Sequence, residues 1–242
     1  MKIRLKDITL ICSSAELADL PERKLLINTI NAFSYNNARK DNTFTEALIK
    51  GDALVPDGMS IVMACRILRA KSRPVERIAG WDLFSYEMEK LNNKGGRVMF
   101  LGSSNAVLHK IKDKAAETYP NVEVVTYSPP YKEEFTEEEN LQIIQAVNER
   151  NPDLLWIGMT APKQEKWAHA NWDKLDIHCH CGTIGAVFDF FAGTTKRAPL
   201  FWQSHGLEWL YRLIMEPRRM WRRYIIGNTK FIAYVISELL GR

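Results

Sequence analysis

The sequence predicts an α/β fold: a Rossmann-like, mostly parallel sheet core with helices on both faces, followed by a basic helical C-terminal appendage. Three observations support this prediction. Short apolar segments alternate with segments of helical periodicity through most of the 242 residues. Glycine-containing or polar turns follow several apolar segments, as they do at the carboxyl ends of parallel strands. The last 47 residues are basic and aromatic, unlike the rest.

The middle of the chain shows the alternation most clearly. Apolar runs predict strands there, and apolar residues at helical spacing predict helices. In chain order we expect a strand at 97–101, a helix at 105–119, a strand at 122–127, a helix at 137–150, a strand at 154–157 and a helix at 162–172. Strands separated by helices indicate a parallel sheet with right-handed crossovers.

The first third follows the same rule less regularly. Residues 1–14 alternate and predict a strand, and the charges within this stretch distinguish it from a signal peptide. Further on, we expect strands at 25–30 and 53–55 and helices at 58–68 and 80–91. The pattern after Pro199 predicts several short helices, one of them beginning at Pro217.

Composition places the boundary between an α/β core, 1–195, and the appendage, 196–242. The appendage holds nine Lys or Arg and three acids, whereas the whole chain has a net charge of +4, so the core is slightly acidic. It also carries Trp209, Trp221 and Tyr224. A basic, aromatic segment favours contact with an anionic membrane surface or a phosphorylated ligand. No apolar run reaches the roughly 18–20 residues of a spanning helix.

Four cysteines are too few for a disulfide scaffold and suit a reducing cytoplasm. The run His178-Cys179-His180-Cys181 lies in a strand that we predict at 176–182. Alternation along a strand sends the two histidines to one face and the two cysteines to the other. Four ligands would then not converge, so we expect no metal site.

Pro56-Asp57-Gly58 lies between a predicted strand and a predicted helix. Asp57 is a candidate N-cap of that helix or a candidate general base at the rim of the sheet. Spacing alone favours the cap.

Other polar turns also follow predicted strands. Gly102-Ser103-Ser104 could hold a phosphate on its backbone N–H groups or be an ordinary turn. It does not match a dinucleotide fingerprint, which argues against an oxidoreductase. Gln164 falls in the first turn of the next helix, facing a ligand at the strand ends. The turn beginning at Gly182 leads to Asp189, for which Arg197 is a candidate partner.

The appendage arginines come as two pairs, Arg218-Arg219 and Arg222-Arg223. Spacing of four residues brings members of the two pairs together on one helix. Guanidinium groups bind phosphate through two hydrogen bonds, so a diphosphate, an anionic lipid or a nucleic acid would relieve their mutual repulsion. The interleaved aromatic residues favour a membrane interface over nucleic acid.

Taken in order, these motifs resemble the WecG/TagA/CpsF glycosyltransferases, glycosyltransferase family 26, from about Leu25 to about Arg223. The residues that carry the resemblance are Thr29-Ile30-Asn31-Ala32, Leu54-Val55-Pro56-Asp57-Gly58, Arg77-Ile78-Ala79-Gly80-Trp81-Asp82-Leu83, Phe100-Leu101-Gly102, Pro162-Lys163-Gln164-Glu165, Gly182-Thr183 through Phe188-Asp189, Lys196-Arg197-Ala198-Pro199, and Gly206-Leu207-Glu208-Trp209-Leu210-Tyr211-Arg212.

The resemblance implies an inverting, metal-independent enzyme without a cofactor. Such enzymes move a sugar from a UDP-sugar to a sugar on a polyprenyl diphosphate, in the synthesis of bacterial surface polysaccharides or wall polymers. They act as peripheral proteins at the cytoplasmic face of the membrane, and the appendage docks there and helps to close the active site. The expected partners are therefore the UDP-sugar, the lipid-linked acceptor and the membrane surface, together with a possible homo-oligomer, but no nucleic acid.

The resemblance also suggests roles for individual residues, and it makes Asp57 the general base rather than only a cap. Thr29, Asn31 and Gln164 match polar residues of the catalytic pocket. The matches to nucleotide-binding regions are Gly102, Ser103, Tyr127, Tyr131 and Gly182. The matches for diphosphate and acceptor binding are Arg197, Arg212, Arg219 and Arg222.

Two departures bear on the donor. The third predicted strand is followed by Gly158-Met159-Thr160-Ala161-Pro162, where the family often has G-x-G-x-P, and the strand before Gly182 is rich in His and Cys. A hexose such as glucose, an N-acetylhexosamine and its uronate therefore stay open as donors. An alternative from another class is a non-catalytic module that binds anionic lipid or nucleic acid through the appendage.

Overall fold

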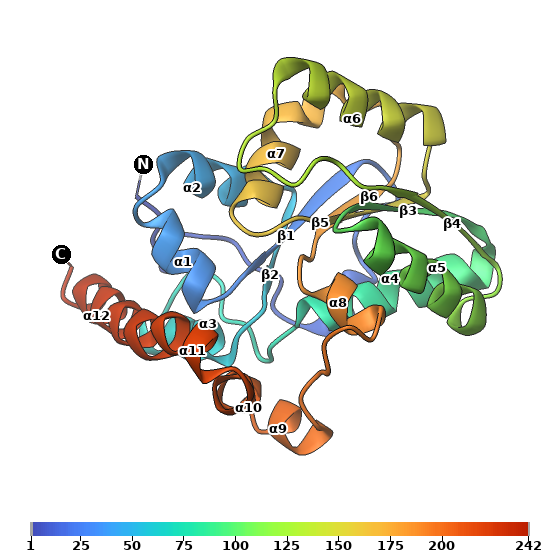
Figure 1. Cartoon of the computed structure of the whole chain (residues 1–242). Coiled ribbons are helices and arrows are strands. Elements are labelled where there is room, and N and C mark those ends of the chain that lie inside the picture. The colour runs from blue at the N-terminus through green and yellow to red at the C-terminus, as the bar shows by residue number, and fades with distance from the viewer. Residues whose placement is uncertain (1, 242) are drawn as a thin grey trace.

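The computed structural model describes residues 2–241, apart from the side chains of Ser204 and Arg219. Six strands form one parallel sheet in the order β2-β1-β6-β5-β3-β4, which confirms the predicted α/β class (Figure 1). The strands are β1 (Leu25–Ile30), β2 (Ala53–Pro56), β3 (Gly96–Gly102), β4 (Val122–Tyr127), β5 (Leu154–Gly158) and β6 (His180–Thr183).

Helices cover both faces of the sheet, with α6 and α7 on one face and α4, α5 and α8 on the other (Figure 1). The helices of the sheet region are α1 (Ala32–Ala38), α2 (Asn42–Ile49), α3 (Met59–Ile67), α4 (Gly80–Lys94), α5 (Asn105–Thr118), α6 (Glu137–Arg150), α7 (Lys163–Asn171) and α8 (Val187–Phe191). The C-terminal helices are α9 (Leu200–Ser204), α10 (Glu208–Met215), α11 (Pro217–Trp221), the π-helical turn η3 (Arg222–Ile226) and α12 (Gly227–Leu239).

The strand predicted for residues 1–14 is wrong for the described residues. Ile3 and Leu5 are buried in alternation with exposed neighbours, so the apolar pattern does reach the core. A turn in which the Asp7 N–H donates to the Arg4 carbonyl then bends the chain before a strand ladder can form. The alternation of apolar and polar residues at this end of the chain therefore indicates which side chains are buried, but it does not indicate a strand.

β6 begins at His180, four residues later than the sequence suggested. Its two neighbours explain the difference, because His180 is in register with Leu25, the first residue of β1, and with Leu154, the first residue of β5. Residues before His180 therefore have no strand on either side with which to pair. Gly182 consequently lies inside the strand and not in the turn that follows it.

The last helix is built into the core. Phe231 and Val235 of α12 are buried in the same apolar cluster as Tyr35 of α1, and Figure 1 shows α12 alongside α1. The phenol of Tyr35 also meets the Phe231 ring edge-on, with centroids 5.5 Å apart.

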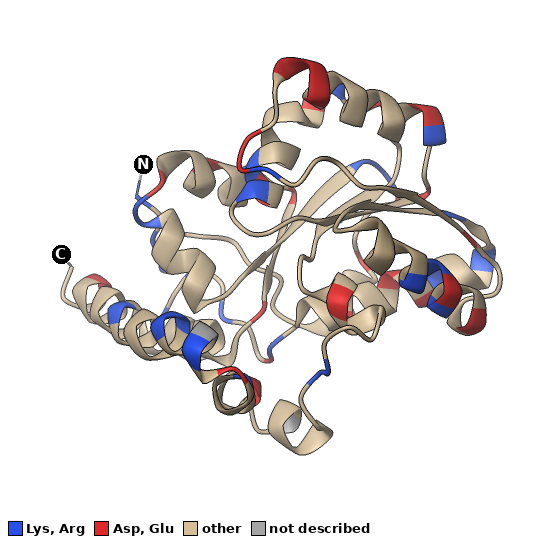
Figure 2. Cartoon of the chain, viewed as in Figure 1, with Lys and Arg blue, Asp and Glu red and all other residues tan. Residues whose placement is uncertain are grey.

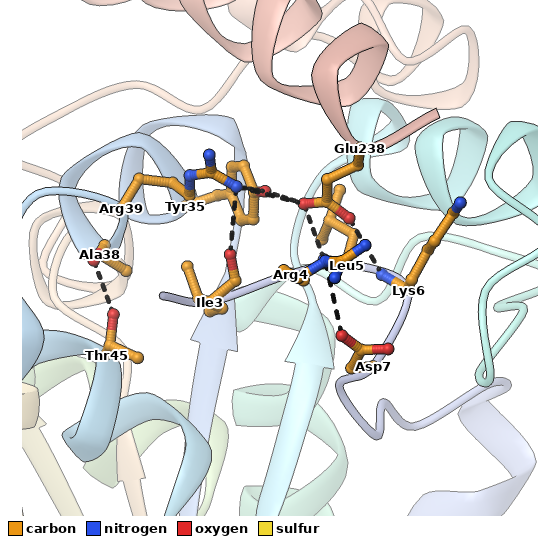
Figure 3. A network of polar contacts seen from close by, with 10 residues as sticks. All are labelled: Ile3, Arg4, Leu5, Lys6, Asp7, Tyr35, Ala38, Arg39, Thr45 and Glu238. Atoms are coloured by element: carbon orange, nitrogen blue, oxygen red, sulfur yellow. Dashed lines mark hydrogen bonds and ion pairs between the residues drawn. The ribbon is translucent and has the colours of Figure 1, made fainter. Parts of the chain in front are cut away.

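A buried carboxylate fixes the far end of α12 (Figure 3). Glu238 is fully buried, and its two oxygens accept hydrogen bonds from the backbone N–H groups of Leu5 and Lys6, at 3.1 and 3.3 Å. The Tyr35 hydroxyl also donates to Glu238, and the Arg39 guanidinium lies 3.7 Å from it. The C-terminus is thus tied to the N-terminal segment and to α1 by a fully satisfied charge.

Candidate active site

Two of the predicted polar residues meet where β1 and β2 end. Ile30 and Pro56 are in register as the last residues of these parallel strands, so Asn31 and Asp57 follow at the same point of the carboxyl edge. The amide nitrogen of Asn31 lies 3.4 Å from Asp57 Oδ2. Residues separated by 26 positions in the chain therefore form one polar pair at the edge where ligands bind in parallel sheets.

The orientation of Asn31 is set by the helix that it begins. Its Oδ1 accepts hydrogen bonds from the backbone N–H groups of Phe33 and Ser34, at 3.0 and 3.1 Å, and thereby caps α1. With Oδ1 engaged, the Nδ2 group is the part of the amide that is left to face Asp57. The cap of one helix thus positions a donor beside the candidate base.

Asp57 is not the N-cap of the helix that follows it. The N-cap of α3 is Gly58, without a side-chain hydrogen bond. Asp57 instead accepts a hydrogen bond from the backbone N–H of Gly80, the first residue of α4. The interpretation as an N-cap of the next helix is therefore wrong, and the carboxylate lies at the positive end of a different helix.

Asp57 has a perturbed proton affinity. Desolvation raises its pKa to about 6, against the opposing effect of the nearby Arg77 guanidinium. The negative charge of Glu208 raises the pKa further, whereas the hydrogen bonds from Asn31 and Gly80 lower it. A carboxyl group with a pKa near 6 is mostly ionised at neutral pH and still binds a proton well, which suits a general base.

A charged cluster connects this edge to the C-terminal region. Arg77 Nη1 lies 3.1 Å from Glu208 Oε2, and the Arg197 Nε lies 3.9 Å from the other oxygen of Glu208. Arg197 also approaches Asp82 at 3.7 Å and stacks over Trp81, with its guanidinium carbon 5.2 Å from the ring centroid. Arg77, Arg197 and Glu208 are largely buried, so Glu208 of α10 belongs to the electrostatic surroundings of Asp57.

The sequence suggested Arg197 as a partner for Asp189, but the two side chains do not pair. The Asp189 carboxylate accepts a hydrogen bond from the Thr194 hydroxyl at 3.2 Å, and its carbonyl accepts from the backbone of Thr194 and Thr195. Asp189 is only half-buried, so its charge does not need an arginine partner.

The other two residues predicted for the catalytic pocket also lie near the carboxyl edge. Thr29 is half-buried and precedes Asn31 by two positions on β1, opposite Val55 of β2. Gln164 is buried in the first turn of α7, and its Nε2 donates to Glu165 Oε1 at 2.9 Å. Desolvation raises the pKa of Glu165 to about 7.

The predicted nucleotide-binding residues are spread over the ends of β3 and β4, the loop beyond β4, and the interior of β6. Gly102 has a φ of +121°, and a Cβ there would lie 2.5 Å from the Gly158 carbonyl oxygen, so this close approach of β3 to β5 requires glycine. The Ser103 N–H donates to the same carbonyl at 3.1 Å. Tyr127 ends β4 and is half-buried, whereas Tyr131 is fully exposed in the loop beyond it.

Gly182 has a packing role inside β6. A Cβ at this position would lie 2.2 Å from the Trp156 ring, which fills the core beside it. The glycine is thus explained by the size of Trp156.

Two of the predicted appendage arginines, Arg212 and Arg222, lie against aromatic rings. The guanidinium carbons of Arg212 and Arg222 are 5.6 Å from the Phe190 centroid and 5.4 Å from the Trp221 centroid. Arg212 is half-buried against α8, whereas Arg222 is exposed. The Arg219 side chain lies outside the described residues. Figure 2 shows the described basic residues of α11 and η3 together on this side of the molecule.

Comparison with known proteins decides the family. The sequence model of the Glycosyl transferase WecG/TagA/CpsF family matches residues 3–242. The chain belongs to this family. It is 31% identical over 213 residues to a Bacillus subtilis N-acetylglucosaminyldiphosphoundecaprenol N-acetyl-beta-D-mannosaminyltransferase, covering 88% of this chain and 79% of the relative. A protein of the same name from Bacillus spizizenii is 29% identical over 234 residues, covering 96% and 87%.

As a member of the WecG/TagA/CpsF family the chain is a glycosyltransferase, and the resemblance inferred from its motifs is confirmed. Among residues 2–241, no group of three or more His, Cys, Asp or Glu side chains is placed to hold a metal ion. His180 and Cys181 point to opposite faces, as strand alternation predicts. Within the same residues, no helix is both long and apolar enough to cross a membrane.

Sequence reasoning missed two members of this candidate site. Arg77 was seen within a motif but given no role, and Glu208 was counted only as one of three acids in a basic segment. They are 131 positions apart, and only the packing of α10 against the sheet region brings them together. The available signal was that an acid in a segment rich in Lys and Arg is expected to have a cation close by if it is buried.

Proposed function

We propose that this chain is an inverting, metal-independent glycosyltransferase that moves a sugar from a UDP-sugar to a sugar on a polyprenyl diphosphate, in bacterial surface polysaccharide or wall polymer synthesis. The observation that carries the proposal is Asp57. It is a desolvated carboxylate with a raised pKa, held at the carboxyl edge by Asn31 and Gly80 and flanked by Arg77. A carboxylate of this kind suits a general base near neutral pH.

In the proposed reaction, Asp57 takes the proton from a hydroxyl of the acceptor sugar. The hydroxyl oxygen attacks the anomeric carbon of the donor, and the bond from that carbon to the UDP oxygen breaks with its electron pair on UDP. Attack from the face opposite UDP inverts the anomeric configuration. Arg77 and Arg197 supply positive charge near the diphosphates, which stabilises charge that develops on the leaving group.

The names of the two relatives support a donor and an acceptor. Both are named for the transfer of N-acetylmannosamine to N-acetylglucosaminyl-diphosphoundecaprenol. We therefore propose UDP-N-acetylmannosamine as the donor and N-acetylglucosaminyl-diphosphopolyprenol as the acceptor. Glucose and the N-acetylhexosamine uronate are the alternatives that a donor assay compares with it.

We further propose that the C-terminal region lies on the cytoplasmic face of the membrane. Several large apolar side chains of this region are exposed, among them Ile225, Ile232 and Ile236. Arg222 and Arg218 are exposed on the preceding turns. Apolar side chains beside arginines suit a surface that lies in the headgroup region of an anionic membrane.

The test is transfer from a panel of radiolabelled UDP-sugars to N-acetylglucosaminyl-diphosphopolyprenol in the presence of EDTA. We expect a labelled lipid from UDP-N-acetylmannosamine at an unchanged rate when EDTA is added. Absence of product from every donor, together with no UDP binding by calorimetry, would favour the non-catalytic binding module instead. Product that appears only after Mg²⁺ or Mn²⁺ is restored would contradict the metal-independent mechanism.

A further inference from the structure

An exposed apolar stripe runs along α3, the helix that begins two residues after Asp57. Met59, Met63 and Ile67 are spaced by four residues and therefore lie on one face of the helix. Their exposed fractions are 39%, 55% and 57%. The opposite face of α3 is buried in the core. Contiguous large apolar side chains on a folded surface mark a site of interaction.

We propose that the Met59–Met63–Ile67 stripe is the binding track for the part of the acceptor's polyprenyl chain that follows the diphosphate. The inference rests on the proposed function, because it takes a lipid-linked sugar as the acceptor. It adds a binding site in the sheet region itself, separate from the apolar side chains of the C-terminal helices.

The first argument is the order of chemistry along the surface. The acceptor consists of a sugar, a diphosphate and an apolar chain, in that sequence. Asp57 would meet the sugar hydroxyl, and Arg77 is held beside Asp57 because the Ile78 N–H donates to the Pro56 carbonyl at 3.1 Å. The stripe then begins at Met59. The Asp57 carboxylate, the Arg77 guanidinium and the apolar stripe thus lie together at the start of α3. One extended acceptor would place its sugar, its diphosphate and its apolar chain against these three features.

The second argument is the position of the turn between α9 and α10. Gly206 has a φ of +68°, and a Cβ at this position would lie 3.4 Å from the Met59 Cβ. The turn therefore packs against the first residue of the stripe and leaves Met63 and Ile67 more exposed. At 1.5 Å per residue, the stripe extends about 12 Å away from the catalytic edge. An apolar chain lying there would be held at one end by this turn.

Side-chain chemistry gives the third argument. Two of the three residues are methionines, whose unbranched and polarisable side chains adapt to irregular apolar partners. An isoprenoid chain is such a partner, since methyl branches interrupt its outline. A bilayer or a second copy of this chain would also cover an apolar stripe. The acceptor chain is the occupant favoured here, because the stripe starts at the catalytic carboxylate and not at a distant surface.

The test uses a variant with Met63→Gln and Ile67→Gln, because glutamine keeps helix propensity and length while adding polarity. Two acceptors are compared, N-acetylglucosaminyl diphosphate on a long polyprenyl chain and the same group on a single isoprene unit, both in detergent. We expect the KM for the long-chain acceptor to rise about tenfold, because apolar contact with two side chains is lost. The KM for the short-chain acceptor and kcat with both acceptors should stay unchanged.

Leu141→Gln is the matched control, since Leu141 is 55% exposed on α6, on a different side of the molecule (Figure 1). It should leave both KM values unchanged. Equal loss with both acceptors, or no change with either, would overturn the proposed track. Weaker sedimentation with anionic vesicles in the absence of acceptor would show that the stripe contacts the bilayer instead.

Binding of the two acceptors is also measured directly, by the change in tryptophan fluorescence. This measurement separates the two proposals. Failure of the wild-type chain to transfer any sugar would contradict the proposed function. A long-chain acceptor that binds the wild type and the variant equally well would contradict the track, whatever the transfer assay shows.

Discussion

Opposite edges of the same sheet hold carboxylates in contrasting surroundings. At the amino edge, Glu87 is buried beside His180, with its Oε1 2.9 Å from His180 Nδ1, and the other ring nitrogen lies 3.0 Å from the Pro21 carbonyl. Two acceptors around one ring call for a doubly protonated histidine. At the carboxyl edge, Asp57 faces the neutral amide of Asn31 at a longer 3.4 Å.

The difference shows how the hydrogen-bond partners of a buried carboxylate decide whether it has a structural or a catalytic role. A buried carboxylate with a charged, hydrogen-bonded partner holds segments of the chain together. A desolvated carboxylate with weaker partners has a raised pKa and can accept a proton from a ligand. Glu238 belongs with Glu87 in this respect, because four groups surround it, whereas Asp57 stands apart from both.

The largest expected effect comes from removing the charge of Asp57, which has weaker hydrogen-bond partners than Glu87 or Glu238. Asp57→Asn should lower the transfer rate by roughly 10²- to 10⁴-fold, the usual contribution of a general base, while UDP affinity and the circular dichroism spectrum stay unchanged. Initial rates with the lipid-linked acceptor check this. The control is Asp52→Asn, because Asp52 lies just before β2 at the opposite edge. Near-normal turnover of Asp57→Asn would show that Asp57 is not the general base and would remove the contrast between the two edges.

Removing a fully satisfied carboxylate should affect stability instead. Glu238→Ala leaves two backbone N–H groups and Arg39 without their acceptor, and we expect the free energy of unfolding to fall by about 3–5 kcal/mol. Urea unfolding measures this loss. The exposed Glu134→Ala variant is the control and should change the free energy of unfolding little. A Glu238→Ala protein as stable as the wild type would contradict the anchoring role.

The amino-edge pair should contribute less, and in a pH-dependent way. Desolvation lowers the pKa of His180, but the hydrogen bond and charge of Glu87 outweigh this effect and leave the pKa raised. The pair therefore contributes fully below the unfolded histidine pKa of about 6.5, and its contribution is lost as the pH rises through the raised native value.

Glu87→Gln should accordingly lower the free energy of unfolding by about 1–3 kcal/mol at pH 6, and by less at pH 9. Urea unfolding at the two pH values provides the measurement. Transfer per folded molecule should stay at the wild-type rate. A large loss of transfer at unchanged stability would contradict the purely structural role of Glu87 at the amino edge of the sheet.

The smallest effect concerns Glu208. Its negative charge raises the pKa of Asp57, and it also holds Arg77, whose positive charge lowers that pKa. Glu208→Gln should therefore move the acidic limb of the pH–rate profile to lower pH. Glu89→Gln, an exposed change on α4, should leave the limb in place. Movement of the limb to higher pH in the Glu208 variant would contradict the effect assigned to the Glu208 charge.

The central sheet could be predicted from the sequence because its strands are buried on both faces. Such strands form short, continuous apolar runs, and the segments predicted at 97–101 and 154–157 correspond to β3 and β5 within one residue at each end. Residues 1–14 were predicted wrongly because alternating burial arises in irregular segments as well. The start of β6 depends on where β1 and β5 begin, which its own residues do not encode.

The candidate site could be predicted in part for a related reason. Asp57 and Asn31 follow strands directly, so the parallel arrangement places them at one edge. The link between Arg77 and Glu208 depends on how α10 packs, and no local pattern encodes it. The orientation of the Asn31 amide toward Asp57 also has no local signal. It depends on the capping of α1 by Asn31 and on the position of Asp57 at the end of the neighbouring strand.

The central claim is that Asp57 is the general base, and the pH dependence of kcat/KM for sugar transfer tests it most directly. Because the raised pKa lies near 6, we predict that kcat/KM rises through about pH 6 and then levels off as Asp57 becomes ionised. The residual activity of Asp57→Asn should lack this limb. A flat profile between pH 5 and pH 8, or the same limb in Asp57→Asn, would contradict the account.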